Sequence, residues 1–239
     1  LRFVLLLTVP VVFVAFLPLL LASVQDRMVA CPPRCVAVDM RKRDVRQVDL
    51  ARADLTQANL SGMDLSGKRL NYANLYFANL EGANLRGASL NDAALRGANL
   101  YQADLSDASM LRADLGGARL RHANLSSANL TAANLSAAEL EGANLLGAQI
   151  DRNTVISDKW RLVWDILNHG AAGANLAGND LRGAYLRAAD LSEANLAGAD
   201  LRDADLTGAD LRRADLRRAM LKGTTLDQST RIEDKWRLV

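Results

Sequence analysis

The amino-acid sequence predicts a repeat solenoid, a fold in which short units wind into stacked coils around one narrow core. A large apolar residue, nearly always leucine, recurs at every fifth position from Leu50 to Ile150 and again from Leu176 to Leu226. The residue two places earlier is alanine in most units. Half of the residues are hydrophobic but only 5% are aromatic, so a globular core of mixed large side chains is hard to build.

A period of five fits neither regular element. On an α-helix, five residues turn through about 500°, so the leucines would spiral around the axis. On a strand, every second leucine would point to the opposite face. The pattern is satisfied if each unit is one short side of a coil that turns between units, with the leucine and the small residue both facing the axis. The two blocks differ in frame by one residue, and the break lies in residues 151–175.

The other positions of the unit are typical of turns. Thirteen of the 16 glycines follow the central residue by two places, where the chain must turn. The residue before the centre is usually Asn or Asp, whose side chain can hydrogen-bond local backbone at a corner. Arginines that follow the centre in the second block, beside these aspartates, predict mixed charged ladders. Met63 and Lys68 replace the small inward residue, which predicts a distorted coil or a local edge near residues 61–70.

The unit resembles the A(D/N)LXX motif of the pentapeptide-repeat family, as in Ala73-Asn74-Leu75, Ala83-Asn84-Leu85-Arg86-Gly87 and Ala209-Asp210-Leu211. Thirty-two units in two registers carry the resemblance. It implies an all-β solenoid, a right-handed quadrilateral parallel β-helix with four units per coil. We therefore expect repeat block 1 at residues 46–150 and repeat block 2 at 171–226. At about 4.8 Å per coil, the blocks would be roughly 25 Å and 13 Å long.

The break between the blocks predicts a short helix. Residues 147–163 align without gaps with residues 223–239, and both copies contain Asp-Lys-Trp-Arg-Leu-Val. In the first copy, apolar residues at 160, 163, 164 and 167 have helical spacing. We therefore expect an amphipathic helix over 158–168, begun by Ser157 or Asp158 and ended by Gly170, within a linker or capping segment at 151–170. Residues 227–239 would be an incomplete second copy.

The candidate residues of this capping segment are Trp160, Trp164 and Trp236. They either anchor a partner or pack on the leucine core as caps. We favour the caps, because the ends of a solenoid carry unpaired backbone and need cover.

Four other aromatic residues form a candidate interaction surface: Tyr72, Tyr76, Phe77 and Tyr101. All lie outside the two inward positions of block 1. With four units per coil, Tyr76 and Tyr101 fall on adjacent coils, on the same side or the next. They are either a patch that binds a protein partner or scattered surface aromatics, and scattered aromatics are the commoner arrangement.

An uncharged run from Phe3 to Val24 precedes the repeats. Its length suits a membrane-spanning helix, and the basic residues after it favour a cytoplasmic repeat domain. We therefore expect a transmembrane helix or signal segment at 1–25, a linker at 26–45 and a membrane-anchored protein. A cleaved signal, which would export the chain, is the alternative. Cys31 and Cys35 form a local disulfide in an oxidising compartment or stay free thiols in a reducing one.

The sequence indicates no catalytic set, cofactor site or metal site. His122 and His169 have no second histidine or cysteine at metal-ligand spacing, so exposed, solvated rings are expected for both. Residues 46–239 carry a net charge of −1, which fits neither a nucleic-acid binder nor a strongly acidic DNA mimic.

We therefore expect a non-catalytic, membrane-associated structural scaffold or protein-interaction module. Its protein partner is unknown, nucleic acid is not expected as a partner, and self-association through the solenoid ends is a further option. The family resemblance implies one alternative, the DNA-mimicking, topoisomerase-protecting role of some members.

Overall fold

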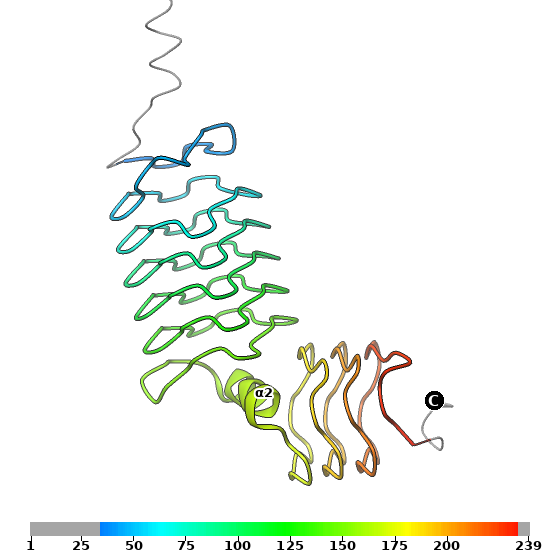
Figure 1. Cartoon of the computed structure of the whole chain (residues 1–239). Coiled ribbons are helices and arrows are strands. Elements are labelled where there is room, and N and C mark those ends of the chain that lie inside the picture. Colours follow the sequence, from blue (N-terminus) through cyan, green and yellow to red (C-terminus); the bar gives the residue numbers. More distant parts are fainter. Residues whose placement is uncertain (1–33, 234–239) are drawn as a thin grey trace, which may run out of the picture.

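The protein consists of two stacks of coils joined by one helix (Figure 1). The computed structural model describes residues 34–233. Stack 1 comprises residues 34–156 and stack 2 comprises residues 171–232. Within the described residues the only helix is α2, Asp158–His169. α2 therefore coincides with the helix predicted over 158–168 and is one residue longer.

Each coil has four sides, and each side is one pentapeptide. Isolated parallel bridges join residues 20 apart throughout both stacks, as in Asn79↔Asn99 and Asp180↔Asp200. The central residue of a side also donates its N–H to the next coil, as Leu75 does to the Ala94 carbonyl at 2.7 Å. This regular ladder confirms the predicted all-β solenoid with four units per coil.

The core of each stack is a column of leucine and alanine. The central leucines and the alanines two places before them are almost all buried, because both positions point to the coil axis on every side. The chain leaves the core at each corner through a residue of positive φ, two places after the centre. Glycine suits that position, as at Gly82 (φ 61°), but Tyr72 (φ 60°) and Phe77 (φ 53°) also adopt it. The Asn or Asp before the centre caps the corner, as Asn59 does by accepting the Ser61 N–H at 3.1 Å.

Stack 1 begins earlier than the leucine pattern indicates, so the predicted linker at 26–45 is wrong over its described part. Cys35, Met40 and Val45 occupy central positions and are at most 5% exposed. They form sides of the first coil, and the fivefold pattern missed them because none is leucine or follows an alanine. Cys35 is disulfide-bonded. Cys31, the chain's other cysteine, lies outside the described residues.

The first coil is paired on two sides only, which agrees with the edge expected near residues 61–70. Asp64 and Arg69 bridge to the following coil, but positions 44 and 49 of the preceding coil make no bridge to them. These are the two sides on which Met63 and Lys68 replace the small inward residue. Lys68 instead donates its Nζ to the Arg46 carbonyl.

The frame changes at a side that is one residue longer, at the end of stack 1. Thr154 takes the inward position there, is 3% exposed, and donates its hydroxyl to the Leu130 carbonyl at 3.0 Å. Asp151 accepts the Thr154 N–H at 2.9 Å. Asp227 and Thr230 make the same closure at the end of stack 2. The internal repeat therefore marks the point where the chain leaves a stack.

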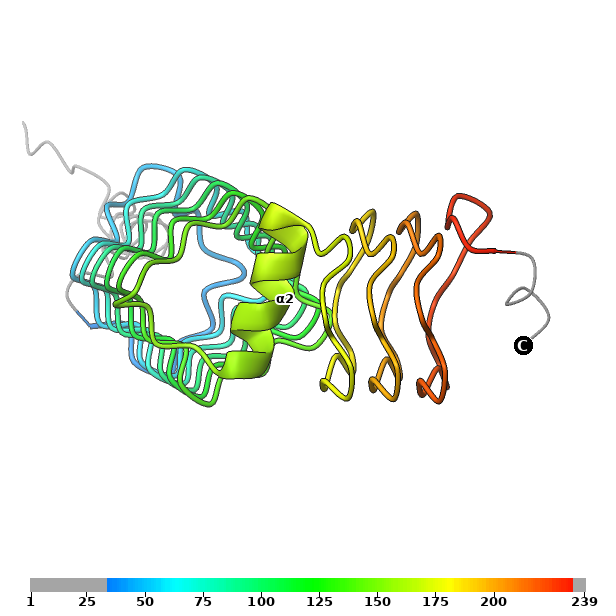
Figure 2. The same cartoon turned by 90° about the horizontal axis from the view of Figure 1, so that it is seen from below.

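α2 lies across the end of stack 1, as Figure 2 shows along the stack axis. Ser157 precedes its first residue and accepts the Arg161 N–H on its carbonyl at 3.0 Å, although the Ser157 side chain makes no capping bond. Gly170 ends it with φ 75° and donates its N–H to the Ile166 carbonyl. The helix therefore starts at Asp158, directly after Ser157, and stops before Gly170.

The inner face of α2 replaces the coil that would otherwise follow. Trp160, Val163 and Ile166 are buried in the core cluster. The Trp164 indole donates its Nε1–H to the Ala148 carbonyl at 2.7 Å. Asn168 donates to the Leu145 carbonyl at 3.1 Å and accepts the Gly147 N–H at 2.6 Å. These side chains satisfy backbone groups that the end of the ladder leaves unpaired.

Stack 2 runs sideways from the end of stack 1, so the molecule is bent (Figures 1 and 2). Gly142 would donate its N–H to a following coil in a continuous stack. It donates instead to the Gly183 carbonyl of stack 2, at 2.7 Å. Lys159 of α2 forms an ion pair with Asp180 of stack 2 at 3.3 Å. The junction is therefore held by the helix and by a direct backbone hydrogen bond.

The predicted localisation requires a correction. Across residues 34–233, no helix is long and apolar enough to cross a bilayer. This finding contradicts the expectation of a membrane-anchored chain with a cytoplasmic repeat domain. The segment on which that expectation rested, the predicted span at 1–25, lies outside the described residues.

Candidate functional site

Three of the four predicted surface aromatics lie on one coil of stack 1. Tyr72, Tyr76 and Phe77 are 55%, 38% and 54% exposed and occupy two successive corners of one coil. The rings of Tyr76 and Phe77 meet edge to face with centroids 4.4 Å apart. The Arg52 guanidinium lies 5.6 Å from the centre of the Tyr72 ring. We call Tyr72, Tyr76 and Phe77 the aromatic ridge.

Tyr101 does not belong to this ridge. Its position is one coil and one further side away from Tyr76, so it lies at another corner. There its ring meets His122 edge to face, with centroids 5.8 Å apart. The four aromatics therefore form two separate groups, because a spacing of 25 residues combines one 20-residue coil with one 5-residue side.

Trp160 and Trp164, the two capping-segment tryptophans that the structure describes, face the stacks. Trp160 is only 6% exposed, and the Trp164 indole is used in the hydrogen bond to stack 1. Lys159 places its ammonium 4.6 Å from the centre of the Trp160 ring. This packing supports the interpretation of Trp160 and Trp164 as caps. Trp236 lies outside the described residues.

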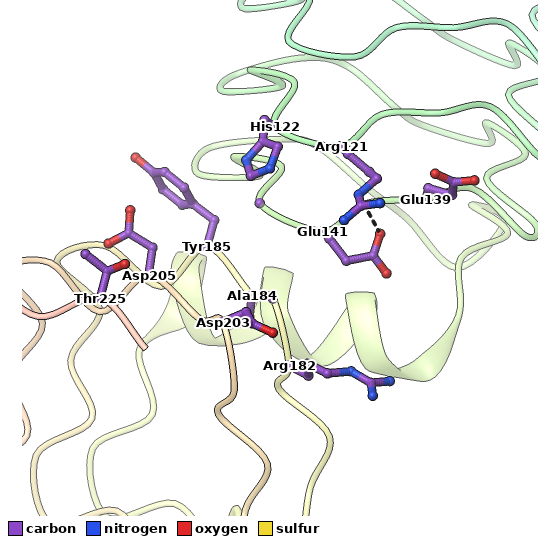
Figure 3. Close-up of a pocket in the computed structure, with 12 residues that line it drawn as sticks. Arg121, His122, Glu139, Glu141, Arg182, Ala184, Tyr185, Asp203, Asp205 and Thr225 are labelled. Carbon is purple, nitrogen blue, oxygen red and sulfur yellow. Dashed lines mark ion pairs between the residues drawn. The ribbon is translucent and has the colours of Figure 1, made fainter. Parts of the chain in front are cut away.

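A groove of about 780 Å³ opens where the two stacks meet (Figure 3). We call it the corner groove. Its lining comes from both stacks and comprises Arg121, His122, Glu139, Glu141, Gly142, Arg182, Gly183, Ala184, Tyr185, Asp203, Asp205 and Thr225. Its floor is the contact between two corners, where Gly142 is bonded to Gly183 and the Glu141 side chain covers Gly183.

The stack 1 wall of the groove carries stacked polar side chains. Arg121 and Glu141 occupy equivalent places on successive coils and lie 3.9 Å apart between Nε and Oε2 (Figure 3). The His122 ring lies over Gly142, where a Cβ atom would collide with it. Gly142 also has φ 70°, a conformation that favours glycine. Glycine is therefore favoured at this corner chiefly by the close approach of the His122 ring, since other residues adopt positive φ at the same place in the unit.

The stack 2 wall also carries two carboxylates and one guanidinium group, on Asp203, Asp205 and Arg182. Asp205 accepts a hydrogen bond from Arg187 at 3.3 Å, but Asp203 forms no ion pair with any described residue. Four carboxylates and two guanidinium groups line the whole groove, which gives it a net charge of −2. Tyr185 adds a half-buried phenol ring to this wall.

The sequence patterns did not reveal the corner groove. Residues of its two walls are tens of positions apart, and the periodicity does not predict how the stacks meet. His122 was expected to be an exposed, solvated ring, and the structure places it on the groove wall. One signal was present in the sequence: Tyr185 stands before a central leucine, where most units have Asn or Asp.

Metal binding has no structural support in the part of the chain that is described. Residues 34–233 contain no group of three or more His, Cys, Asp or Glu side chains placed to hold a metal ion. The His169 ring is hydrogen-bonded to the Asp165 carboxylate one helical turn earlier, with Nδ1 and Oδ1 2.8 Å apart, and it lies beside the Trp164 ring. The two histidines of the chain are thus placed separately, one at the groove and one at the end of α2.

The 20-residue parallel coils define a protein of the β-helical repeat class. Comparison with family profiles matches the profile described as pentapeptide repeats (8 copies) at residues 34–71, 49–87, 73–110, 108–148, 172–208 and 194–230. The chain therefore belongs to the pentapeptide-repeat family, whose members form right-handed quadrilateral β-helices. The matches fall in both stacks and leave out α2.

Several solved structures are similar to this chain. A pentapeptide-repeat protein of the Arabidopsis thaliana thylakoid lumen is 32% identical, with 48% of this chain and 78% of that chain covered and a TM-score of 0.43. HetL of Nostoc sp. strain PCC 7120, described as involved in heterocyst differentiation regulation, is 31% identical over 82% of this chain and 88% of that chain, with a TM-score of 0.34. The fluoroquinolone resistance protein QnrB1 is 21% identical over 71% and 90%, with a TM-score of 0.38. No curated protein matches the chain significantly.

Proposed function

We propose that this chain is a non-catalytic protein-interaction module, a bent scaffold that docks a partner protein on the aromatic ridge. The observation that carries the proposal is the exposure of Tyr72, Tyr76 and Phe77 on neighbouring corners of one coil. Large aromatic side chains are enriched among the residues that contribute most to protein–protein binding. The proposal requires no reacting group and no cofactor.

The coil beneath the ridge holds these rings in place. Phe77 donates its N–H to the Arg96 carbonyl at 3.0 Å, and Tyr72 donates its N–H to the Asn91 carbonyl at 2.9 Å. Phe77 also packs over Gly97 of the next coil, which has no side chain to displace it. A partner would therefore meet aromatic groups that lose little conformational freedom on binding.

The scaffold part of the proposal rests on the closed junction between the stacks. α2 covers the end of stack 1, so self-association through stack ends would use the first coil of stack 1 or the last coil of stack 2. Met220 and Leu226 are 43% and 45% exposed on that coil. The topoisomerase-protecting alternative has less support, because Asp200, Asp210 and Asp215 are paired with arginines and do not present a continuous negative surface.

The test is a binding comparison between two matched variants. Partners of the full chain are trapped by photo-crosslinking at position 76 in extracts of the source cells, identified, and purified for titration. The double variant Tyr72→Ser with Phe77→Ser should bind the purified partner at least about tenfold more weakly, since interface hot spots contribute about 2 kcal/mol or more each.

Leu146→Ser is the control, because Leu146 is 49% exposed and lies away from the ridge. Circular dichroism would verify that each variant remains folded. Equal affinity of the ridge variant and the unaltered chain for every trapped partner would refute the proposal.

A further inference from the structure

The last coil of stack 2 is more exposed than the last coil of stack 1. Leu145 and Leu221 each stand two residues before a copy of the internal repeat. Leu145 is 1% exposed beneath α2, whereas Leu221 is only partly buried. Ile150 packs against the core, but Leu226, which aligns with it, is 45% exposed. Within the described residues no helix lies over this last coil, so it keeps contact with water that α2 removes from stack 1.

The chain leaves stack 2 through the same closure that leads into α2. Thr230 is 4% exposed and donates its hydroxyl to the Leu206 carbonyl at 3.1 Å, as Thr154 does to its own stack. Ile232 packs against the core, as Ile156 does shortly before α2 starts. The backbone therefore reaches the end of the described residues at the place from which α2 begins in the first copy.

The next six residues, which lie outside the described part of the chain, repeat the start of α2 without a change. Residues 234–239 are Asp-Lys-Trp-Arg-Leu-Val, identical to the first six residues of α2. In α2, Trp160 and Val163 of this hexapeptide are 6% and 0% exposed in the core cluster. Arg161 donates to the Thr154 carbonyl at 2.7 Å. The second hexapeptide thus contains the apolar residues and the arginine that hold α2 on stack 1.

A second copy of the chain is a less suitable cover for the end of stack 2. Residues 213–232 carry five basic and two acidic side chains, and residues 34–53 of the first coil carry six and three. An end-to-end or end-to-start contact between copies would therefore bring like charges together. Gly142, which bonds to Gly183 where stack 2 meets stack 1, corresponds to Arg218 in stack 2. The hexapeptide needs no such corner contact, because the buried face of α2 packs on the core inside the coil.

From these observations we infer that residues 234–239 dock on the end of stack 2 and cover it. Trp236 would lie on the central leucines of the last coil, as the buried tryptophan of α2 lies on stack 1. Arg237 would donate to the Thr230 carbonyl. Burial of the indole ring and cover for the unpaired edge of the ladder both favour this docking. The inference concerns the solenoid end and not the aromatic ridge, and it leaves this end unavailable for self-association.

The test measures the exposure of Trp236 to water in the full chain labelled with 5-fluorotryptophan. The three tryptophans give three fluorine NMR signals, which single tryptophan-to-phenylalanine variants assign. The shift of each signal between H2O and D2O reports contact with water. We expect a shift for Trp236 close to that of Trp160 and well below the value in the urea-unfolded chain, because both rings would be buried.

Two variants of the segment locate the contact. Trp236→Ser removes the ring, whereas Asp234→Ser changes a residue whose counterpart in α2, Asp158, is exposed. Trp236→Ser should speed hydrogen exchange at least about tenfold at the Met220 and Thr225 amides, which bond the last coil to the coil before it. Asp234→Ser should leave these rates within about twofold of the unaltered chain. Neither variant should change exchange in the middle coils of stack 1.

A Trp236 signal as exposed as in the unfolded chain would overturn the inference, and so would unchanged exchange in Trp236→Ser. Protection of the last coil that rises with protein concentration would mean that a second copy covers this end, which also refutes the inference. Trp236→Ser should bind the ridge partner as the unaltered chain does. Failure of the docked segment and failure of the aromatic ridge are therefore distinguishable.

Discussion

The two stacks have the same kind of leucine and alanine core but stabilise their outer surfaces differently. In stack 1 the residue before the centre is often asparagine, and the amides bond from coil to coil, as Asn99 donates to Asn79 at 3.0 Å. In stack 2 the same position is mostly aspartate. There Asp200 and Asp210 each receive two short bonds from the arginine two places later, Arg202 or Arg212.

The difference follows from what a column of identical side chains can do. An amide has both a donor and an acceptor, so stacked asparagines can bond to one another. A carboxylate has only acceptors, and carboxylates stacked about 4.8 Å apart repel one another. Asp190 and Asp210 show this, since the charge of Asp210 opposes the lowered pKa of Asp190. The arginine after the centre offsets this repulsion at Asp200, Asp210 and Asp215, whereas the hydroxyls of Ser192 and Thr207 donate to Asp190 and Asp205.

The largest effects are expected from substitutions in the core, which can be compared between the two stacks. Leu100→Ala and Leu196→Ala each remove a fully buried leucine and should each cost about 2–5 kcal/mol of unfolding free energy. Stack 2 is shorter and has fewer neighbouring coils to support it. When unfolding in urea is followed by hydrogen exchange, stack 2 of Leu196→Ala should unfold in a separate transition at lower urea, while the amides of stack 1 stay protected. A single shared transition for both variants would show that the stacks unfold as one unit.

The second expected effect is acid sensitivity. The arginine bonds lower the pKa of Asp200 and Asp210 to about 2, and the Ala132 N–H with other donors lowers the pKa of Asp151 to about 2. These values lie below the ordinary aspartate pKa of about 3.9 in an unfolded chain. The resulting stability is therefore present above about pH 4 and is lost as the pH falls towards 2.

Thermal melts between pH 5 and pH 2 would measure this loss. Asp210→Asn should be less stable than the unaltered chain at pH 5 and should change less between pH 4 and pH 2. An identical pH dependence of the two proteins would contradict the assignment of acid sensitivity to these pairs.

A smaller effect concerns the helix between the stacks. Trp164→Phe keeps most of the packing but removes the Nε1 donor from the Ala148 carbonyl. The loss should cost about 1–3 kcal/mol, since a buried acceptor is left unsatisfied. Melting followed by hydrogen exchange at the last coil of stack 1 would measure it. Trp164→Phe should leave exchange in the middle coils unchanged, and uniform loss of protection along the stack would contradict a local capping role.

The smallest expected effect converts one stack 1 unit to the stack 2 type. Asn124 donates to Asp104 at 3.1 Å, so Asn124→Asp would place two carboxylates together and cost about 0.5–1 kcal/mol. Adding Ser126→Arg supplies a guanidinium two places later, as in the Asp200–Arg202 unit. Urea unfolding should show that the double variant regains part of the lost stability. No recovery would indicate that the arginine pairing of stack 2 depends on its own coil geometry.

Much of the fold was predictable because every unit repeats the same local requirement. The leucine and alanine positions, the turn glycines and the helix near 158–169 each follow from the spacing of a few residues. The pattern failed where other residues met the same requirement. Cys35, Met40 and Val45 fill central positions of the first coil without being leucine, so the start of stack 1 was placed too late.

The candidate surfaces were less predictable, because their grouping depends on how coils and sides bring residues together. Tyr72, Tyr76 and Phe77 could be recognised because they depart from the inward pattern within one coil. Their separation from Tyr101 depends on counting coils and sides together. Trp160 and Trp164 could be assigned as caps only as a preference, which the burial of Trp160 and the hydrogen bond of Trp164 support.

The sequence by itself determined the coil: a five-residue period with leucine and alanine inward leaves one way to bury both, and identical units stack on each other. The direction of stack 2 depended on the tertiary structure, because it is set by contacts between residues far apart in the chain. The bond from Gly142 to Gly183 and the Lys159–Asp180 pair belong to this group. The corner groove exists only because of that bend, so no local pattern could encode its position.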